Sequence, residues 1–148
     1  IKMIREMTAN DRETFLSLMD TFYQSGAVLH PIPREYMLTT FAEATAGSPF
    51  IKVYLFEVEE KPAGYGQLSF TYSSEVGGMV GLIEELFVTE AYRSHGLGSQ
   101  FITFIKENYP KARRFRLEIE ESNTAAQRLY ERHGFEILPY RQMVYEPK

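Results

Sequence analysis

The segment LIEELFVTEAYRSHGLGSQFI, residues 82–102, carries the strongest structural signal in this chain. An apolar, β-branched strand ends in a short polar turn, and a loop with Gly96 and Gly98 leads directly into an apolar helix. Glycines let a backbone approach a ligand closely, and the free N–H groups and positive dipole end of a helix favour phosphate. The segment therefore predicts an anion-binding loop.

Two glutamates stand inside the strand of this segment. Glu84 and Glu85 interrupt a run of residues that otherwise has the pattern of a strand buried on both faces. Carboxylates in such a strand, next to a phosphate-binding loop, suggest an enzyme.

Length and composition indicate an ordinary globular protein. A chain of 148 residues most simply forms one domain, residues 1–148, and folding at this size buries roughly 70% of the surface of the unfolded chain. Hydrophobic residues make up 44% and charged residues 24%, which argues against disorder and fibrous architectures.

Several function classes are disfavoured by the residues that the chain lacks. There is no cysteine, and the three histidines lack the spacing of zinc ligands, so we expect no metal. The net charge of −4 argues against nonspecific nucleic-acid binding. No apolar run approaches the roughly 20 residues of a membrane span, and Ile1 opens no recognisable signal peptide. We therefore expect a cytoplasmic protein with no membrane partner.

The order of predicted elements is mixed. Alternation and helical spacing predict strand 1–7, a helix with Phe15 to Phe22, a helix with Tyr36 to Ala44, and antiparallel strands 50–60, 63–72 and 80–89. A capping box of Asn10 and Glu13 is expected at the first helix. Beyond the glycine loop we predict a helix from Leu97 to Tyr109, strand 114–120, a helix from Asn123 to Gly134, and final strands 135–137 and 142–145.

Two motifs carry a family resemblance. FVTEAYRSHGLGSQ resembles the acyl-CoA pyrophosphate loop of the GCN5-related N-acetyltransferase (GNAT) family, which reads Gln or Arg, two residues, Gly, one residue, then Gly or Ala. NTAAQRLYERHGFEI, residues 123–137, resembles the family's later motif. The resemblance implies an α+β fold along essentially the whole chain, with a mixed, mostly antiparallel sheet and about four helices.

Two nucleotide-binding loop motifs match the glycine loop less well. A dinucleotide-binding fingerprint needs a third small residue where Phe101 stands, and a Walker A loop needs Gly-Lys-Ser/Thr, which is absent. A purely structural turn is the remaining alternative.

The resemblance implies acetyl-CoA as the cofactor. Its pyrophosphate would rest on a loop in which Ser94 and His95 replace the Gly and Lys of many members, and its pantetheine would pair with the preceding strand. Such pairing needs a bulge or splay between strands 80–89 and 114–120, since a fully paired strand has no free backbone groups. Glu84 and Glu85 sit where such a distortion is expected. The implied contacts are Leu86, Phe87, Val88, Arg93, Ser94, His95, Gly96, Leu97, Gly98, Ser99 and Asn123.

Transfer to an amine requires a base, a group for the developing negative charge and an acid. Strand parity places Glu84 and Glu85 on opposite faces, and the resemblance favours Glu84 as base, directly or through water. An ion pair of Glu84 with Arg116 is the structural alternative, and Glu85 is expected to pair structurally. An N–H near Phe87 or Val88 would stabilise the oxyanion. The resemblance assigns Tyr130 as the acid, facing Glu84 across the thioester; a core tyrosine is the alternative.

The acceptor is the least defined part of the prediction. Aromatic residues and glutamates suit a small cationic amine, and residues 82–93 resemble the family's polyamine acetyltransferases. A protein or peptide N-terminus, or a noncatalytic CoA-binding regulatory module, are the alternatives. Homodimer formation is left open.

Overall fold

A computed structural model describes residues 2–26, 28 and 30–148. The chain divides into two compact units, residues 1–118 and 119–148. The first unit contains the whole sheet and three of the helices. The predicted first strand, 1–7, is observed from Lys2, because Ile1 lies outside the described residues.

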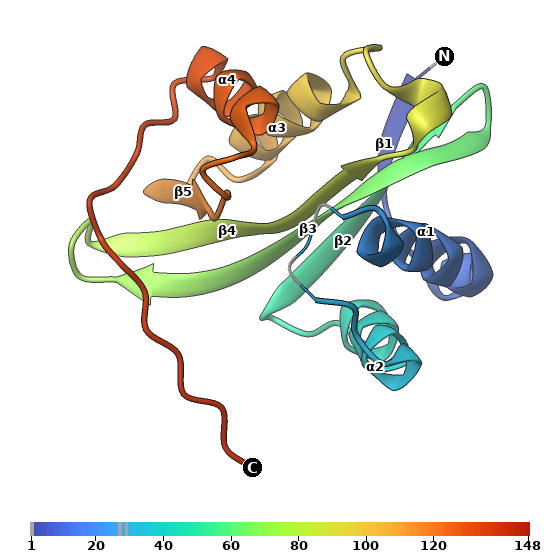
Figure 1. The fold of residues 1–148 in the computed structure, drawn as a ribbon, viewed down its shortest axis with the longest axis horizontal. Coiled ribbons are helices and arrows are strands. Elements are labelled where there is room, and N and C mark those ends of the chain that lie inside the picture. Colours follow the sequence, from blue (N-terminus) through green and yellow to red (C-terminus); the bar gives the residue numbers. More distant parts are fainter. Residues whose placement is uncertain (1, 27, 29) are drawn as a thin grey trace. The chain divides into compact units, whose positions relative to one another are not determined.

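The first unit is built on a five-stranded sheet in the order β1-β2-β3-β4-β5 (Figure 1). Strands β1 to β4 are antiparallel neighbours, and β5 runs parallel to β4. The predicted three consecutive antiparallel strands are thereby confirmed. The bounds are β1 (Lys2–Glu6), β2 (Ile51–Val58), β3 (Lys61–Ser73), β4 (Gly78–Val88) and β5 (Arg114–Leu117).

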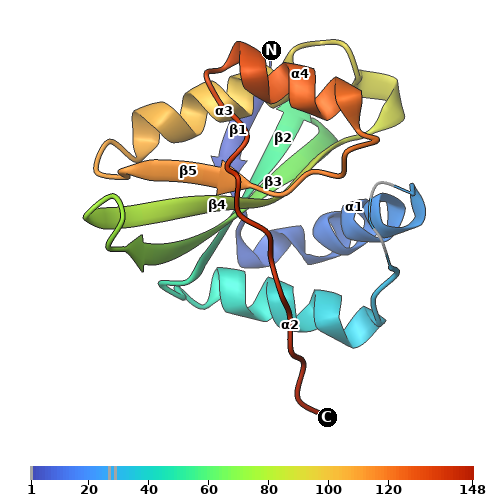
Figure 2. The same ribbon diagram turned by 60° about the vertical axis from the view of Figure 1, so that its left-hand side comes forward.

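Helices cover both faces of this sheet. Helices α1 (Arg12–Gln24) and α2 (Arg34–Thr45) lie on one face, and α3 (Leu97–Asn108) lies on the other (Figures 1 and 2). Two short 3-10 turns, η1 (Ala9–Asp11) and η2 (Glu90–Tyr92), precede α1 and α3. This mixed, mostly antiparallel arrangement confirms the α+β class.

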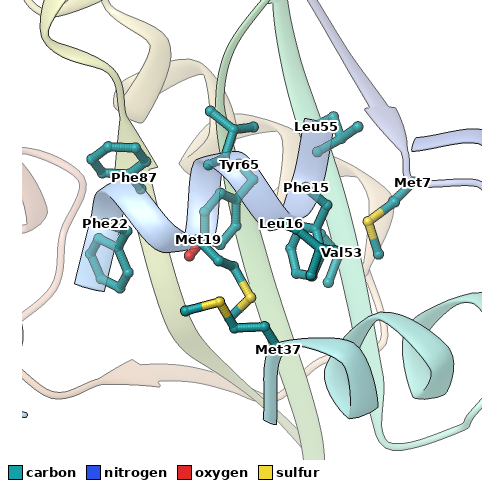
Figure 3. Packing of buried hydrophobic residues seen from close by; sticks show 11 residues of the cluster. Met7, Phe15, Leu16, Met19, Phe22, Met37, Val53, Leu55, Tyr65 and Phe87 are labelled. Carbon is teal, nitrogen blue, oxygen red and sulfur yellow. The ribbon is translucent and has the colours of Figure 1, made fainter. Parts of the chain in front are cut away.

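The face under α1 and α2 holds a cluster of buried apolar side chains. Apolar side chains of the two helices point toward those of β2, β3 and β4 (Figure 3). Burial of this kind is the main driving force of folding, at about 1.5–3 kcal/mol for each large apolar side chain. The members of this buried cluster are Met7, Phe15, Leu16, Leu18, Met19, Phe22, Met37, Val53, Leu55, Tyr65 and Phe87.

The face under α3 depends on a glycine in β3. A Cβ placed on Gly66 would lie 2.3 Å from Cζ of Phe101, whose side chain is fully buried. The ring of Phe101 also packs against Tyr54 and Phe56 of β2. Gly66 therefore allows α3 to pack closely on the sheet.

The predicted capping box at Asn10 and Glu13 is wrong by two positions. Thr8 is the N-cap, its side chain accepts the N–H of Asn10, and its own N–H donates to Asp11 at 2.8 Å. Asp11 also pairs with both terminal nitrogens of Arg5, at 2.8 and 2.9 Å, which lowers the pKa of its carboxyl to about 2. This ion pair ties β1 to Asp11, the residue at which the 3-10 turn η1 passes into α1.

The second unit contains one helix, α4 (Thr124–Arg132). Asn123 caps it by accepting the N–H of Ala126 at 3.1 Å, as predicted, and Gly134 follows its end with a φ of +88°. The predicted final strands at 135–137 and 142–145 are wrong, because the described residues beyond Leu117 include no strand. Alternating apolar residues form a strand only where their backbone finds a ladder partner. The strand predicted over 114–120 likewise ends at Leu117.

Candidate active site

A β-bulge places Glu84 in a special position in β4. Gln67 of β3 lies opposite Glu85, and the next pair joins Leu68 to Ile83, so Glu84 has no opposite residue. A bulge inserts one extra residue, disrupts the ladder and redirects side chains, and bulges are frequent beside active sites. Regular strand parity therefore does not hold between Ile83 and Glu85.

The predicted splay begins at the same point. The pairing of β4 with β5 covers Val80 to Ile83 and stops at Leu117, whereas β4 continues to Val88. Within the described part of the chain, β4 has no strand neighbour on this side from Glu84 onward. An extended ligand can therefore pair along residues 86–88 on this side, apart from the Val88 carbonyl, which accepts from Arg93.

The loop after β4 has the backbone of an anion-binding turn. Ser94 and Gly96 both have left-handed φ angles, +64° and +79°, and Gly96 is the N-cap of α3. No side-chain cap bonds the first turn of α3 in the described structure. Left-handed residues in a tight turn direct backbone N–H groups to one side, which suits an anion together with the helix dipole.

Two side-chain contacts hold this loop. The Nε of Arg93 donates to the Val88 carbonyl at 3.1 Å, and Nζ of Lys2 donates to the His95 carbonyl at 2.5 Å. The bond from Arg93 ties the loop to the end of β4, and that from Lys2 ties it to β1. These two bonds hold the predicted loop residues just beyond segment 86–88.

Glu85 is held by two tyrosine hydroxyls. Tyr23 of α1 donates to one carboxylate oxygen at 2.5 Å, and Tyr65 of β3 donates to the other at 2.7 Å. Burial raises the pKa of Glu85, and the two tyrosine hydrogen bonds partly oppose the shift. The expectation that Glu85 pairs structurally agrees with this geometry, although its partners are tyrosines rather than cations.

Glu84 lies close to two other carboxylates and to one guanidinium group. The residue is exposed overall, yet partial removal of its carboxyl from water raises its pKa, and the charges of Glu118 and Glu85 raise it further. The charge of Arg116 opposes this shift. A carboxyl with a raised pKa is a better proton acceptor once ionised, which suits a general base.

The later motif supplies Tyr130 and Asn123 in the second unit. Tyr130 is 8% exposed, its ring packs edge-on to Phe135 at 5.5 Å between centroids, and burial raises its pKa to about 12. Its hydroxyl is therefore protonated at neutral pH. The Asn123 side chain is used as the helix cap.

Sequence reasoning missed the position of Gln67 opposite Glu85 and the tyrosine partners of Glu85. Gln67 is a polar residue within a buried stretch of β3, and that contrast is the signal that could have singled it out. The bond from Tyr23 to Glu85 joins residues 62 positions apart, and local pattern gives no sign of it.

Comparison with known proteins settles the family. The model of the acetyltransferase (GNAT) family matches residues 12–135, which cover most of the chain. The chain belongs to the GNAT family. It is an N-acetyltransferase that uses a CoA-based acyl donor.

Solved structures share the GNAT fold of this chain. A possible acetyltransferase from Clostridium difficile 630 has a TM-score of 0.85 at 18% identity, over 100% of this chain and 99% of its own. The acetyltransferase AAC(6')-Iy, in complex with a bisubstrate analogue, has a TM-score of 0.80 at 19% identity, over 100% and 99%. A ribosomal-protein-alanine N-acetyltransferase from Brucella melitensis biovar Abortus 2308 has 0.76 at 13% identity, over 99% of both chains.

No curated protein matches the sequence. Among the described residues, no helix is long and apolar enough to cross a membrane.

Proposed function

We propose that this GNAT protein transfers an acetyl group directly from acetyl-CoA to a primary amine of a small cationic molecule. The observation that carries the proposal is the position of Glu84, the extra residue of the bulge, where β4 separates from β5. A carboxylate there stands next to the open backbone of residues 86–88. The surrounding carboxylates of Glu85 and Glu118 favour a positively charged acceptor.

The residues present fit a CoA thioester. Leu86, Phe87 and Val88 have no strand neighbour on the β5 side, where the pantetheine would pair, and the loop from Arg93 to Ser99 offers left-handed turns and a helix N-terminus for the pyrophosphate. The bound cofactor supplies the activated acetyl group. A backbone N–H near Phe87 or Val88 is the proposed donor to the carbonyl oxygen as it becomes negative.

Two side chains move protons in this proposal. Glu84 accepts a proton from the ammonium or attacking amine, directly or through water. Tyr130 donates its hydroxyl proton to the departing thiolate, and its raised pKa keeps that proton in place at neutral pH. The Asn123 side chain caps the helix that carries Tyr130. We also propose that the chain around Asn123 contacts the cofactor.

We also propose that the two units form one domain, residues 1–148. The family match supports this, because residues 12–135 cross the boundary between units at residues 118 and 119.

The direct test is release of CoA thiol from acetyl-CoA in the presence of polyamines, aminoglycosides, amino acids and peptides, with product masses measured. The proposal expects acceptor-dependent release with small cationic amines and addition of one acetyl group to them. Release only with peptides would overturn the small-molecule assignment in favour of a peptide acceptor. Binding of acetyl-CoA without release for any amine would overturn the catalytic proposal.

A further inference from the structure

The last turn of α1 is anchored on the bulged part of β4. The hydroxyl of Tyr23 donates to one carboxylate oxygen of Glu85 at 2.5 Å. The ring of the preceding residue, Phe22, packs against Phe87 at 5.4 Å between centroids (Figure 3). Glu85 and Phe87 are two positions apart in β4, so both face α1. The end of α1 is thus joined to β4 directly beside the extra residue of the bulge, Glu84.

The carboxylate of Glu85 is an unfavourable group to bury at this position. Moving a charge out of water costs several kcal/mol. Burial raises the pKa of Glu85, and the hydrogen bonds from Tyr23 and Tyr65 oppose that shift without cancelling it. The two hydroxyls do not require a charge, because a neutral amide could accept from one of them and donate to the other. Stability of the fold alone therefore does not account for this carboxylate.

The charge of Glu85 acts on its neighbour, Glu84. After removal from water, the charges of Glu118 and Glu85 raise the pKa of Glu84, and the charge of Arg116 lowers it. Of these three charges, that of Glu85 is fixed in place by two tyrosine hydroxyls. Burial, the bond to Glu85 and the charges of both glutamates raise the pKa of Tyr23, so its hydroxyl keeps its proton and remains a donor.

We propose that Glu85 and Tyr23 are positioning residues for the reaction, because their bond ties α1 to the bulge and holds a carboxylate charge beside Glu84. The inference rests on the proposed role of Glu84 as the base. A fixed negative charge nearby favours the protonated form of Glu84 and so makes its carboxylate a stronger base. Removal of the bond or of the charge should weaken that base.

The test is the pH profile of kcat/KM with acetyl-CoA and 1,4-diaminobutane. Tyr23→Phe removes a donor that keeps Glu85 ionised, and Glu85→Gln removes the charge and keeps the shape. In both variants the acidic limb should move to lower pH, and the plateau should fall about two- to fivefold, because a carboxylate of lower pKa is a weaker base. Tyr109→Phe removes a partly buried hydroxyl that bonds Tyr54 on the α3 face of the sheet. This matched control should leave the limb in place.

A carboxyl titration separates this inference from the proposed function. The protein is labelled at its glutamate carboxyl carbons and titrated by NMR, and the Glu84 signal is identified by its loss in Glu84→Gln. The Glu84 midpoint should lie lower in Tyr23→Phe and in Glu85→Gln than in the wild type, whether or not any amine is acetylated.

Two results would overturn the inference and leave the proposed function standing. One is an unmoved Glu84 midpoint in Glu85→Gln, which also decides the matter alone if Tyr23→Phe does not fold. The other is a Tyr23→Phe variant that loses stability in urea and keeps the wild-type midpoint, because the bond would then only secure α1.

Discussion

Gln67 lies opposite Glu85 in the ladder between β3 and β4, and the next pair skips Glu84. Because of this one-residue bulge, the adjacent residues Glu84 and Glu85 have different surroundings. Glu85 is fixed by tyrosine hydroxyls from α1 and β3. Glu84 stands at the position where β4 leaves β5. Our proposal of Glu84 as the base rests on this difference.

The base assignment predicts a pH dependence. Removal from water and the charges of Glu118 and Glu85 raise the pKa of Glu84, and only its ionised form accepts a proton. The kcat/KM of the wild type should therefore rise with pH through an inflection above the ordinary glutamate pKa. Glu84→Gln should lose that inflection and lower kcat about 100-fold. The pH profiles of kcat/KM for the two proteins check this. The ionisation of the amine substrate affects both profiles equally, so a difference between them reports on Glu84. An unchanged acidic limb in Glu84→Gln would rule out the assignment.

The acid assignment predicts a split between turnover and binding. Tyr130→Phe keeps the buried ring and removes the proton that its raised pKa retains at neutral pH. We expect kcat to fall about 100-fold or more while the Kd for CoA stays within about twofold. Steady-state kinetics and calorimetry measure the two quantities. Normal turnover by Tyr130→Phe would make this residue an ordinary core tyrosine.

The loop predicts a stabilising substitution. Ser94 has a φ of +64°, in the left-handed region where a side chain costs about 1 kcal/mol and glycine does not. Ser94→Gly should raise the free energy of unfolding by up to about 1 kcal/mol and leave CoA affinity equal or higher. Urea unfolding and calorimetry test it. Ser74→Gly, at an exposed residue without positive φ, serves as control and should not stabilise. A less stable Ser94→Gly would show that the serine makes a compensating contact.

The packing of α3 predicts a destabilising substitution. In Gly66→Ala the new Cβ meets the buried ring of Phe101 at 2.3 Å, so the free energy of unfolding should fall by about 1–3 kcal/mol. Phe101→Leu in the same chain should recover part of the loss, which a double-mutant cycle in urea detects. Full stability of Gly66→Ala would mean that α3 can shift on the sheet.

The sequence predicts best the features that are local. The glycines of the loop and the Asn123 cap act on neighbouring backbone, so both could be predicted. The family resemblance predicts a distortion where Glu84 and Glu85 sit, but the residue pattern alone does not place a bulge between β3 and β4, because the parity argument assumes a regular strand. The bond between Tyr23 and Glu85 depends on the packing of α1 against β4, which no short pattern records. The final strands failed because alternation is local, whereas a strand needs a partner.

A single-turnover experiment distinguishes direct transfer to a small amine from the alternatives. Excess protein is mixed with acetyl-CoA labelled in its acetyl group, with or without 1,4-diaminobutane, and quenched at intervals for mass analysis of protein and amine. Direct transfer predicts that the label stays in acetyl-CoA without amine and passes to the diamine when it is present, with no acetylated protein at any time. Labelled protein formed before the amine is added, or a diamine left unlabelled, would contradict direct transfer to a small amine.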